Sequence, residues 1–372
     1  MREAPRTILQ LTFQGDGAGS TQSILSLSEQ LARRGHRVLV GCRPESLLFG
    51  LARGTGLEAV ALNFSRLGRL ARALGPLIAD RRVDIVNTHA TRDRRVLTWL
   101  RLRGTLPAAL VVTRRTMPLT SPFELRLVGA AADRTIAVSG AVAQALVRRW
   151  HPVARLRVVP NGIDLARVDA PVLPAELAAA RAALGDTGGR RVVAIVSRRK
   201  DQHVLLAGMA GVEQPTLVAC VGVEPDAELR ARAADLPSRH RAVFIPFVPR
   251  PLAFYRLADV AALPSRIEGL SQTLLEAMAL GLPVVASDAG GNRDLVTDGV
   301  TGRLVAPLDP GAWADALSVL LGPPALAQRL AHAGRALVRR EFTVQRTAER
   351  TEAIYREALL RRAQLLGRDA PM

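Results

Sequence analysis

Residues 264–292 read PSRIEGLSQTLLEAMALGLPVVASDAGGN, an apolar run that contains two carboxylates, Glu268 and Glu276. A carboxylate among apolar residues is costly unless a partner compensates for its lost hydration. Glu268 follows the strand-like run DVAALPS, which ends at Ser265. It precedes GLSQTLLEAMALG, whose pattern predicts a helix that Gly281 ends. We therefore expect both carboxylates to hold a ligand at a strand-to-helix junction.

This junction is a candidate anion site. The backbone N–H groups of Gly269, Leu270 and Ser271 fall in the first turn of the predicted helix, where N–H groups lack helical partners. Such a turn binds phosphate and other anions. Glu276 lies eight residues after Glu268, and eight steps of about 100° place the two carboxylates about 80° apart around a helix, so both can reach one ligand. The alternative is that Glu268 is an ordinary N-terminal helix charge and Glu276 is satisfied by backbone groups.

Composition indicates a folded chain of two domains. The chain has 372 residues and a mass of 39.9 kDa, which is long for one core, and 48% of its residues are hydrophobic. No uncharged apolar run is long enough to predict a membrane span. The first residues do not have the pattern of a secretion signal. Cys42 and Cys220 show no metal-ligand spacing, so we expect two reduced thiols in a cytoplasmic protein.

The charge is strongly positive and is carried almost entirely by arginine. The formal net charge is +18, and Lys200 is the only lysine among 51 basic residues. A positive excess favours anionic partners. Aromatic residues make up only 3% of the chain, which argues against the stacking platforms of single-stranded nucleic-acid binding. We expect a phosphate-bearing substrate or an anionic lipid surface and no nucleic acid, and we regard Lys200 as a functional candidate.

Strand-like and helix-like segments alternate along both halves of the chain. The strand-like runs of the first half are ILQLTF, RVLVGC, VDIVNTH, AALVVTRR and DRTIAVS. A second alternating series contains RVVAIVS, HVLLAGMA, PTLVACVG, AVFIPFV, DVAALPS, PVVASD and GRLVAP. This pattern is typical of α/β domains with parallel sheets, in which ligands bind outside the carboxyl ends of the strands.

The stretch EGLSQTLLE fits the motif Glu-x7-Glu, and the chain resembles the retaining GT-B glycosyltransferases of family 4, also called group 1. The resemblance extends over residues 8–360 and includes VVPNGIDLARVD and GAGSTQSILSLSEQLARRGHRVLV. It implies two Rossmann-like domains facing across a cleft, with a C-terminal helix that crosses back to the first domain. We expect an acceptor domain over residues 1–165 together with a helix at 351–372, a linker over 166–187, and a nucleotide-sugar donor domain over 188–350.

The resemblance also implies roles for single residues. Glu268 corresponds to the glutamate that contacts the donor sugar, and Glu276 to the one that binds the ribose hydroxyls, for which an acceptor-only carboxylate is suited. Arg198 and Lys200 correspond to the pair that holds the diphosphate and stabilises the leaving group. Arg199 is interpreted as a solvated loop residue.

Four further positions are candidates for contacts with the donor. We expect the backbone around Phe247 and Val248 to contact the base of the nucleotide. Gln272 and Asn292 are candidates for contacts with the donor sugar. None of these positions carries a motif, so the base and the sugar are not predicted.

The chain departs from the family pattern at several positions. Only one residue separates Arg198 from Lys200, where relatives have a longer loop, and Ser197 stands where glycine is common. In the first domain, VVTRRT places Arg115 where relatives often carry a histidine. His89, at the end of the predicted strand VDIVNTH, is the alternative substrate-binding histidine, although a lone histidine is more often structural.

Gly17 and Gly19 of the segment GDGAGS suggest a rival interpretation, a nicotinamide dinucleotide fold. Counted from Gly15 and Gly17, the pattern GxGxxG would need a glycine at position 20, which is Ser20; counted from Gly17 and Gly19, it would need one at position 22, which is Gln22. The second predicted strand ends in GCR rather than in an acidic residue for a ribose, which argues against this rival. In the glycosyltransferase interpretation, Gly19 lets the backbone approach the donor phosphate and the acceptor.

The sequence contains no Asp-x-Asp pair and no cluster with metal-ligand spacing, so we expect a metal-free reaction without a cofactor. The expected reaction is retaining transfer of a sugar from a nucleotide-diphosphate sugar to a hydroxyl of a glycan or lipid-linked acceptor, in lipopolysaccharide or cell-envelope polysaccharide biosynthesis. Two alternatives stay open. One is a nucleotide-sugar epimerase or phosphorylase on the same fold, and the other is a non-catalytic glycan-binding assembly protein.

Two segments indicate contact with an anionic membrane. Residues 65–82 alternate arginines with leucines, and residues 92–104 add arginines beside Trp99. Basic amphipathic helices lie on anionic lipid surfaces, but an ordinary surface helix of an arginine-rich protein has the same pattern. On the first interpretation the protein is peripheral at the inner face of the plasma membrane.

Overall fold

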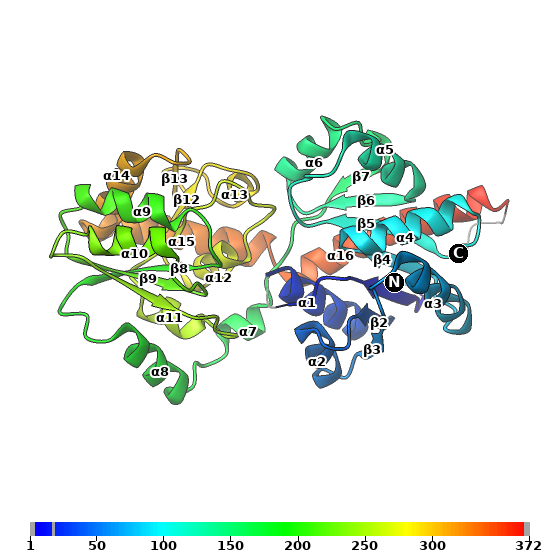
Figure 1. Cartoon of the computed structure of the whole chain (residues 1–372), viewed down its shortest axis with the longest axis horizontal. Coiled ribbons are helices and arrows are strands. Elements are labelled where there is room, and N and C mark those ends of the chain that lie inside the picture. The colour runs from blue at the N-terminus through cyan, green and yellow to red at the C-terminus, as the bar shows by residue number, and fades with distance from the viewer. Residues whose placement is uncertain (1–3, 17–18, 368–372) are drawn as a thin grey trace. The chain divides into compact units, whose positions relative to one another are not determined.

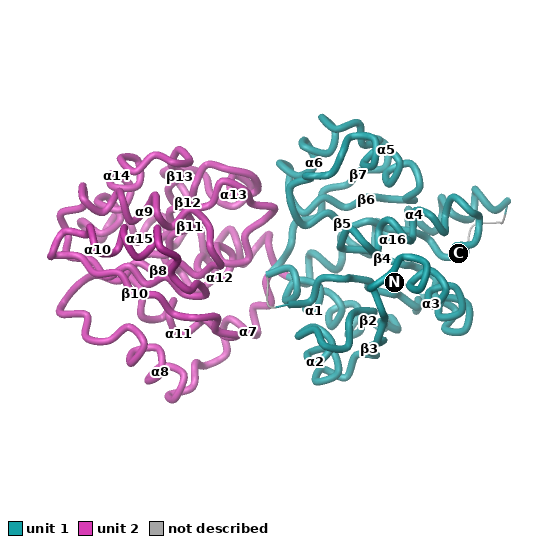
Figure 2. The backbone as a smooth tube through the Cα atoms, viewed as in Figure 1, with its two compact units in different colours: residues 1–162, 344–372 teal, residues 163–343 magenta. Residues whose placement is uncertain are grey.

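A computed structural model describes residues 4–16 and 19–367 of the chain. The chain forms two compact units, shown in different colours in Figure 2. Unit 1 consists of Met1–Gly162 and Val344–Met372, and unit 2 consists of Ile163–Thr343. Each unit is a parallel β-sheet covered by helices (Figure 1).

Unit 1 contains, within the described residues, a parallel sheet with the strand order β3-β2-β1-β4-β5-β6-β7. Its strands are β1 (Thr7–Leu11), β2 (Arg37–Cys42), β3 (Glu58–Ala61), β4 (Ile85–Thr88), β5 (Ala109–Arg114), β6 (Arg134–Ala137) and β7 (Leu156–Val158). Its helices are α1 (Gly19–Arg33), α2 (Leu47–Gly54), α3 (Leu67–Asp80), α4 (Thr91–Leu102), α5 (Pro122–Ala131), α6 (Gly140–Val147), the short 3-10 helix η1 (Val153–Arg155) and α16 (Val344–Leu365).

Both faces of this sheet are covered, because successive strand residues point to opposite sides. Ile8 packs in a core cluster with residues of α1 and α16, whereas Leu9 and Leu11 pack with residues of α3 and α4. The C-terminal helix α16 therefore returns to the first domain, as expected. It begins at Val344, earlier than the expected position 351.

The amphipathic helix predicted within residues 65–82 is α3, and its apolar side faces inward. Leu70, Leu74 and Ile78 are buried in the core of unit 1. Leu67 stays 47% exposed at the start of the helix. The leucines on which the membrane interpretation of this helix depended are thus mostly part of the core.

Unit 2 contains, as far as the structure describes it, a parallel sheet with the strand order β10-β9-β8-β11-β12-β13. Its strands are β8 (Arg191–Val196), β9 (Thr216–Val221), β10 (Arg241–Ile245), β11 (Val260–Leu263), β12 (Val284–Ser287) and β13 (Arg303–Val305). Its helices are α7 (Leu165–Asp169), α8 (Pro174–Leu184), α9 (Gln202–Gly208), the 3-10 helix η2 (Met209–Gly211), α10 (Ala227–Ala234), α11 (Leu252–Leu257), α12 (Gln272–Leu280), α13 (Asn292–Leu295), α14 (Pro310–Leu321) and α15 (Pro324–Glu341).

Residues 166–187, which we expected to form a linker, are a structured part of unit 2. Ala180 and Leu184 of α8 are buried in a core cluster with β8 and β9. Asp169 at the end of α7 forms a two-pronged ion pair with Arg339 of α15, with Oδ1 2.8 Å from a guanidinium nitrogen. The short helix α7 is thereby fixed against unit 2.

Among the described residues, no helix is long and apolar enough to span a membrane.

Candidate active site

Two neighbouring loops of unit 2 bring predicted site residues together. One loop follows β8 and the other follows β11, and these strands pair in parallel with Val260 opposite Val193. The chain order of the sheet reverses at β8, which is where ligands bind in such sheets. Asp201 joins the loops, because its Oδ2 accepts a hydrogen bond from the backbone N of Arg266 at 2.9 Å and its own N donates to the oxygen of Pro264 at 3.1 Å.

Lys200 and Glu268 meet between these loops. Nζ of Lys200 lies 2.9 Å from Oε1 of Glu268, and it also lies 3.4 Å from the backbone oxygen of Ile267. The lysine side chain is 27% exposed and the glutamate side chain 15% exposed. A ligand at the surface can therefore reach both charged groups.

Gln202, which the sequence analysis did not identify, shapes the first loop. Its side chain is fully buried, and its Oε1 accepts a hydrogen bond from the backbone N of Lys200 at 2.6 Å. Its Nε2 donates to the oxygen of Arg198 at 2.8 Å and to Oγ of Ser197 at 3.2 Å. One buried amide thus holds the backbone that carries both predicted diphosphate-binding cations. No sequence pattern indicated this role, because a glutamine after a strand is common.

The two arginines of this loop have different surroundings. Arg199 donates from Nε to Asp226 at 2.7 Å and also pairs with Glu228, so it is tied to α10 and is not a freely solvated residue. The side chain of Arg198 is exposed and forms no hydrogen bond or ion pair with the residues that the structure describes. Arg198 is therefore available to a ligand.

Glu276 on α12 is buried, with 7% of the residue exposed, and it forms an ion pair with Arg167 of α7. Burial raises the pKa of Glu276, and the charge of Arg167 opposes that rise. Tyr255 lies nearby, and its pKa is raised well above the usual value by burial and by the charge of Glu276. Arg167 was not predicted, since it falls in the segment interpreted as a linker.

The helix after Glu268 begins later than predicted. Helix α12 starts at Gln272, and Ser271 caps it by accepting a hydrogen bond from the backbone N of Leu274 at 3.2 Å. Gly269 and Leu270 precede the helix, so the expectation that they form its first turn was wrong. Ser271 determines where the helix begins, because its side-chain oxygen accepts a hydrogen bond from a backbone N–H group of the first turn that has no partner within the helix.

A pair of glycines supports the Glu268 loop. The backbone N of Gly291 donates to the oxygen of Glu268 at 3.2 Å. A Cβ atom on Gly291 would lie 1.8 Å from the oxygen of Gly269, and one on Gly290 would lie 2.1 Å from the oxygen of Glu268. Only glycine fits such a close approach of two backbones. The repeated glycine in SDAGGN was a signal for this contact that the sequence analysis did not use.

In unit 1, His89 and Arg115 belong to one buried network. Nε of Arg115 donates to Nδ1 of His89 at 3.2 Å, so Nε2 of the ring carries the proton and donates to Oε1 of Gln10 at 2.8 Å. Burial lowers the pKa of His89 well below its usual value, which keeps the ring neutral. Arg115 also donates to Oδ1 of Asn161 at 2.6 Å. The histidine therefore positions Arg115 and has no ring nitrogen left for a substrate proton.

The remaining predicted positions lie as follows. Gly19 is the exposed first residue of α1, while Gly17 lies outside the described residues. Phe247 is 54% exposed and follows β10. Asn292 is fully buried and donates from Nδ2 to the oxygen of Ser287 at 3.0 Å, so in this arrangement it does not reach a sugar. Gln272 is the first residue of α12.

Within residues 4–16 and 19–367, no group of three or more His, Cys, Asp or Glu side chains could hold a metal ion.

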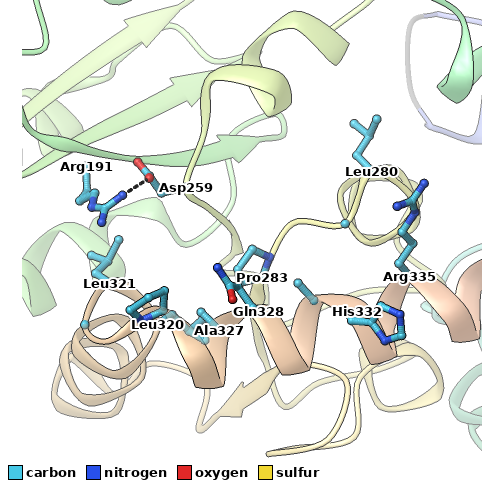
Figure 3. Close-up of a pocket in the computed structure, with 14 residues that line it drawn as sticks. Arg191, Asp259, Leu280, Pro283, Leu320, Leu321, Ala327, Gln328, His332 and Arg335 are labelled. Atoms are coloured by element: carbon cyan, nitrogen blue, oxygen red, sulfur yellow. Dashed lines mark hydrogen bonds and ion pairs between the residues drawn. The ribbon is translucent and has the colours of Figure 1, made fainter.

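A pocket of about 420 Å³ in unit 2 is separate from this site (Figure 3). It is lined by Arg191, Asp259 and Pro283, which begin or directly precede β8, β11 and β12. It therefore lies at the amino-terminal edge of the sheet, whereas Lys200 and Glu268 lie beyond the carboxyl-terminal edge. Its Arg191 is paired with Asp259 at 2.7 Å.

Comparison with known proteins places the chain in a family. Residues 17–167 match the family described as Glycosyltransferase Family 4, and residues 190–322 match Glycosyl transferases group 1. The D-inositol 3-phosphate glycosyltransferase of Xylanimonas cellulosilytica is 34% identical, over 94% of this chain and 94% of that protein. The chain therefore belongs to the family 4 or group 1 glycosyltransferases.

Two further similarities support this family and its fold. The D-inositol 3-phosphate glycosyltransferase of Nocardia farcinica is 35% identical over 68% of this chain, although the match spans only 57% of that relative's length. The crystal structure of HepE from Anabaena in complex with UDP-glucose has a TM-score of 0.79 and 21% identity, and it covers 93% of this chain and 98% of that one. The predicted GT-B architecture of two Rossmann-like domains is confirmed.

Proposed function

We propose that this chain transfers a sugar from a nucleotide-diphosphate sugar to an acceptor hydroxyl, with retention of the anomeric configuration and without a metal ion. The observation that carries the proposal is the Lys200–Glu268 pair beside the unpartnered side chain of Arg198. In this proposal the diphosphate binds Lys200 and Arg198. The carboxylate of Glu268 is then released from the lysine and accepts hydrogen bonds from the sugar hydroxyls.

The two cations act where charge develops. As the bond from the anomeric carbon to the phosphate oxygen breaks, negative charge grows on the nucleoside diphosphate, and two fixed cations stabilise it. The acceptor oxygen forms its bond to the anomeric carbon on the same face. Its proton passes to an oxygen of the departing phosphate, so no protein base is needed, in agreement with the fully engaged ring of His89.

The nucleoside is assigned to Glu276. We propose that the oxygen of Glu276 not held by Arg167 accepts hydrogen bonds from the ribose hydroxyls. Arg167 stabilises the charged form of a carboxylate that burial would otherwise protonate. The backbone near Phe247, which follows β10, is assigned to the base.

Unit 1 is proposed to bind the acceptor, and we propose that this acceptor carries a phosphate. The two relatives described above are named for D-inositol 3-phosphate, a small phosphorylated polyol. In unit 1, Arg115 keeps its charge, because burial lowers its pKa only to about 10. A phosphorylated polyol is thus favoured over the lipopolysaccharide acceptor expected from the sequence, and a lipid-linked glycan phosphate is the second candidate. We place the reaction in the cytoplasm.

The decisive experiment is a thermal-shift screen of the purified protein with UDP, GDP, ADP, CMP and NADPH. We expect one nucleoside diphosphate to stabilise the protein, and Glu276→Ala to abolish that shift. Stabilisation by NADPH alone, or by none of the five, would refute the donor assignment. The matching nucleotide sugar is then incubated with inositol phosphate or with a lipid-linked glycan in the presence of EDTA. Proton NMR of the product gives its anomeric configuration, and turnover without any acceptor would favour an epimerase or phosphorylase.

A further inference from the structure

Exposed apolar side chains gather on one region of unit 1. Leu119, Phe123 and Trp150 are 80%, 72% and 62% exposed. Isolated exposed apolar residues are normal, but a contiguous group marks a contact surface. The exposed large apolar residues of this region are Trp99, Leu102, Leu119, Phe123, Leu127, Val147, Trp150 and Val153.

These residues lie on three helices that hydrogen bonds join, and we call their exposed side the α4–α5–α6 surface. Arg95 of α4 donates to both carboxylate oxygens of Glu124 of α5, at 2.9 and 2.8 Å. Arg149, two residues after the end of α6, donates to the backbone oxygen of Thr120, two residues before α5, at 2.9 Å. Helix α5 therefore lies between α4 and the end of α6. On α5, Phe123 and Leu127 are four residues apart and share one side of the helix.

The charge of this surface is positive. Residues 91–155 contain twelve arginines and three acidic residues. Arg94 and Arg114 are buried, and Arg134 is paired with Glu357, so these three do not add to the charge of the surface. Asp93 and Asp133 are buried, with 0% and 1% exposure, and Glu124 is held by Arg95. The arginines are interleaved with the apolar side chains: Arg126 and Arg148 are exposed, and the guanidinium of Arg103 lies 4.8 Å from the ring centre of Trp99.

From these observations we propose that the α4–α5–α6 surface docks on a membrane that contains anionic lipids. Protruding leucine, phenylalanine and tryptophan side chains enter the interface between headgroups and acyl chains, while the arginines bind lipid phosphates. Two other occupants fit less well. A second copy of the chain would bring like charges together, and nucleic acid would gain little from protruding aliphatic groups such as Leu119.

This inference rests on the proposed transfer to a phosphate-bearing acceptor, and it places a membrane contact on the α4–α5–α6 surface instead of on α3. Helix α3 presents its arginines to solvent, but its apolar side is buried in the core and cannot enter lipid. Phosphate-bearing lipid acceptors would then reach a protein already held at the bilayer. Vesicle flotation measures lipid binding itself, so this inference can fail while the transferase assignment holds.

The test is flotation of the full chain with two kinds of vesicles: phosphatidylcholine alone, and phosphatidylcholine mixed with phosphatidylglycerol in equal parts. We expect binding to the mixed vesicles only. Leu119→Ser combined with Phe123→Ser should lower the bound fraction about tenfold, because two apolar side chains no longer enter the interface. The matched control is Leu173→Ser combined with Val300→Ser, two residues of unit 2 that are 56% and 55% exposed, and it should bind like the unchanged protein.

Three results would overturn the proposal: no binding to the anionic vesicles, equal loss in both double variants, or equal binding in all three proteins. A dimer that the Leu119 and Phe123 changes dissociate would assign the surface to self-association. Displacement from vesicles by single-stranded RNA with retained RNA binding would assign it to nucleic acid. The nucleotide thermal shift, measured on the same variants, should be unchanged, which separates a defect in lipid binding from a defect in the donor site.

Discussion

Lys200 and Glu268 form an ion pair, with Nζ 2.9 Å from Oε1, although they lie in loops that follow different strands of unit 2. Both side chains are partly open to solvent, so the pair contributes little stability and separates at small cost. The ion pair thereby holds both groups near the place where a diphosphate and a sugar would meet. Such preorganisation is what a reaction driven by charge stabilisation requires.

Lys200→Ala should abolish most transfer while the fold stays intact. The variant removes one of two cations from the leaving group, and the loss of one such contact lowers kcat by about 10² to 10³-fold. The measurement is steady-state kinetics with the matching nucleotide sugar, together with the thermal unfolding temperature.

Arg191→Ala is the matched control for this variant. Arg191 begins the same strand, β8, and forms a comparable single ion pair with Asp259 at 2.7 Å, but at the opposite edge of the sheet. The kcat of the Arg191→Ala variant should stay within about twofold of that of the unchanged protein, since an exposed ion pair contributes little to the stability of the fold. Normal turnover by Lys200→Ala would remove Lys200 from the site.

Arg167→Ala should destabilise unit 2 through Glu276. The substitution leaves a buried carboxylate without its cation, which costs about 2 kcal/mol or more in the free energy of unfolding. Adding Glu276→Gln removes the buried charge, so the double variant should recover part of that loss. Urea unfolding of the two single variants and the double variant gives the coupling energy. If the changes in the free energy of unfolding of the two single variants add up to that of the double variant, the ion pair does not account for the destabilisation of Arg167→Ala.

The position of the two loops was predictable because local sequence rules determine it. The apolar runs before Ser197 and Ser265 predicted strands β8 and β11, and parallel strands bring their carboxyl ends to one edge. The only lysine, Lys200, stood out by composition alone. In the structure Lys200 contacts Glu268, although the two residues are 68 positions apart in the chain.

The unpredicted parts depend on tertiary packing. Arg167 meets Glu276 because α7 folds against α12, and no local pattern records that contact. Gln202 acts through hydrogen bonds to backbone atoms, for which many polar residues would look equally suitable in a sequence. The amphipathic pattern of α3 is the same whether its apolar side meets a core or a membrane. Only the burial of Leu74 and its neighbours decides between them.

Nucleotide affinity should fall as the pH is lowered from neutral into the mildly acidic range. Burial raises the pKa of Glu276 above its ordinary value of 4.5, so this carboxylate takes up a proton at a higher pH than an exposed glutamate does. The protonated group loses its ion pair with Arg167 and accepts hydrogen bonds less well.

The sign for stability is opposite to that for affinity. A raised pKa means that the folded state binds this proton more tightly than the unfolded state, so the contribution of Glu276 favours folding at low pH and is lost as the pH rises through the raised pKa. Acid should therefore weaken nucleotide binding without unfolding the protein through this group. Isothermal titration calorimetry of nucleotide binding at several pH values checks this. The Glu276→Gln variant should bind the nucleotide weakly, with an affinity that does not change with pH. An equally steep profile in that variant would assign the titration to another group.

Gly291→Ala should lower activity by displacing the loop that carries Glu268, although Gly291 itself is not expected to contact the donor. The added Cβ would lie 1.8 Å from the backbone oxygen of Gly269, so the loop that carries Glu268 must shift. A misplaced contact to the sugar lowers kcat/KM, and we expect a loss of about 10²-fold. The control is Gly75→Ala in α3, where an added Cβ would meet no atom within 4 Å and the helix favours alanine. That variant should keep full activity and equal or higher stability. Activity of Gly291→Ala equal to that of the control would show that the position of the Glu268 backbone does not limit the reaction.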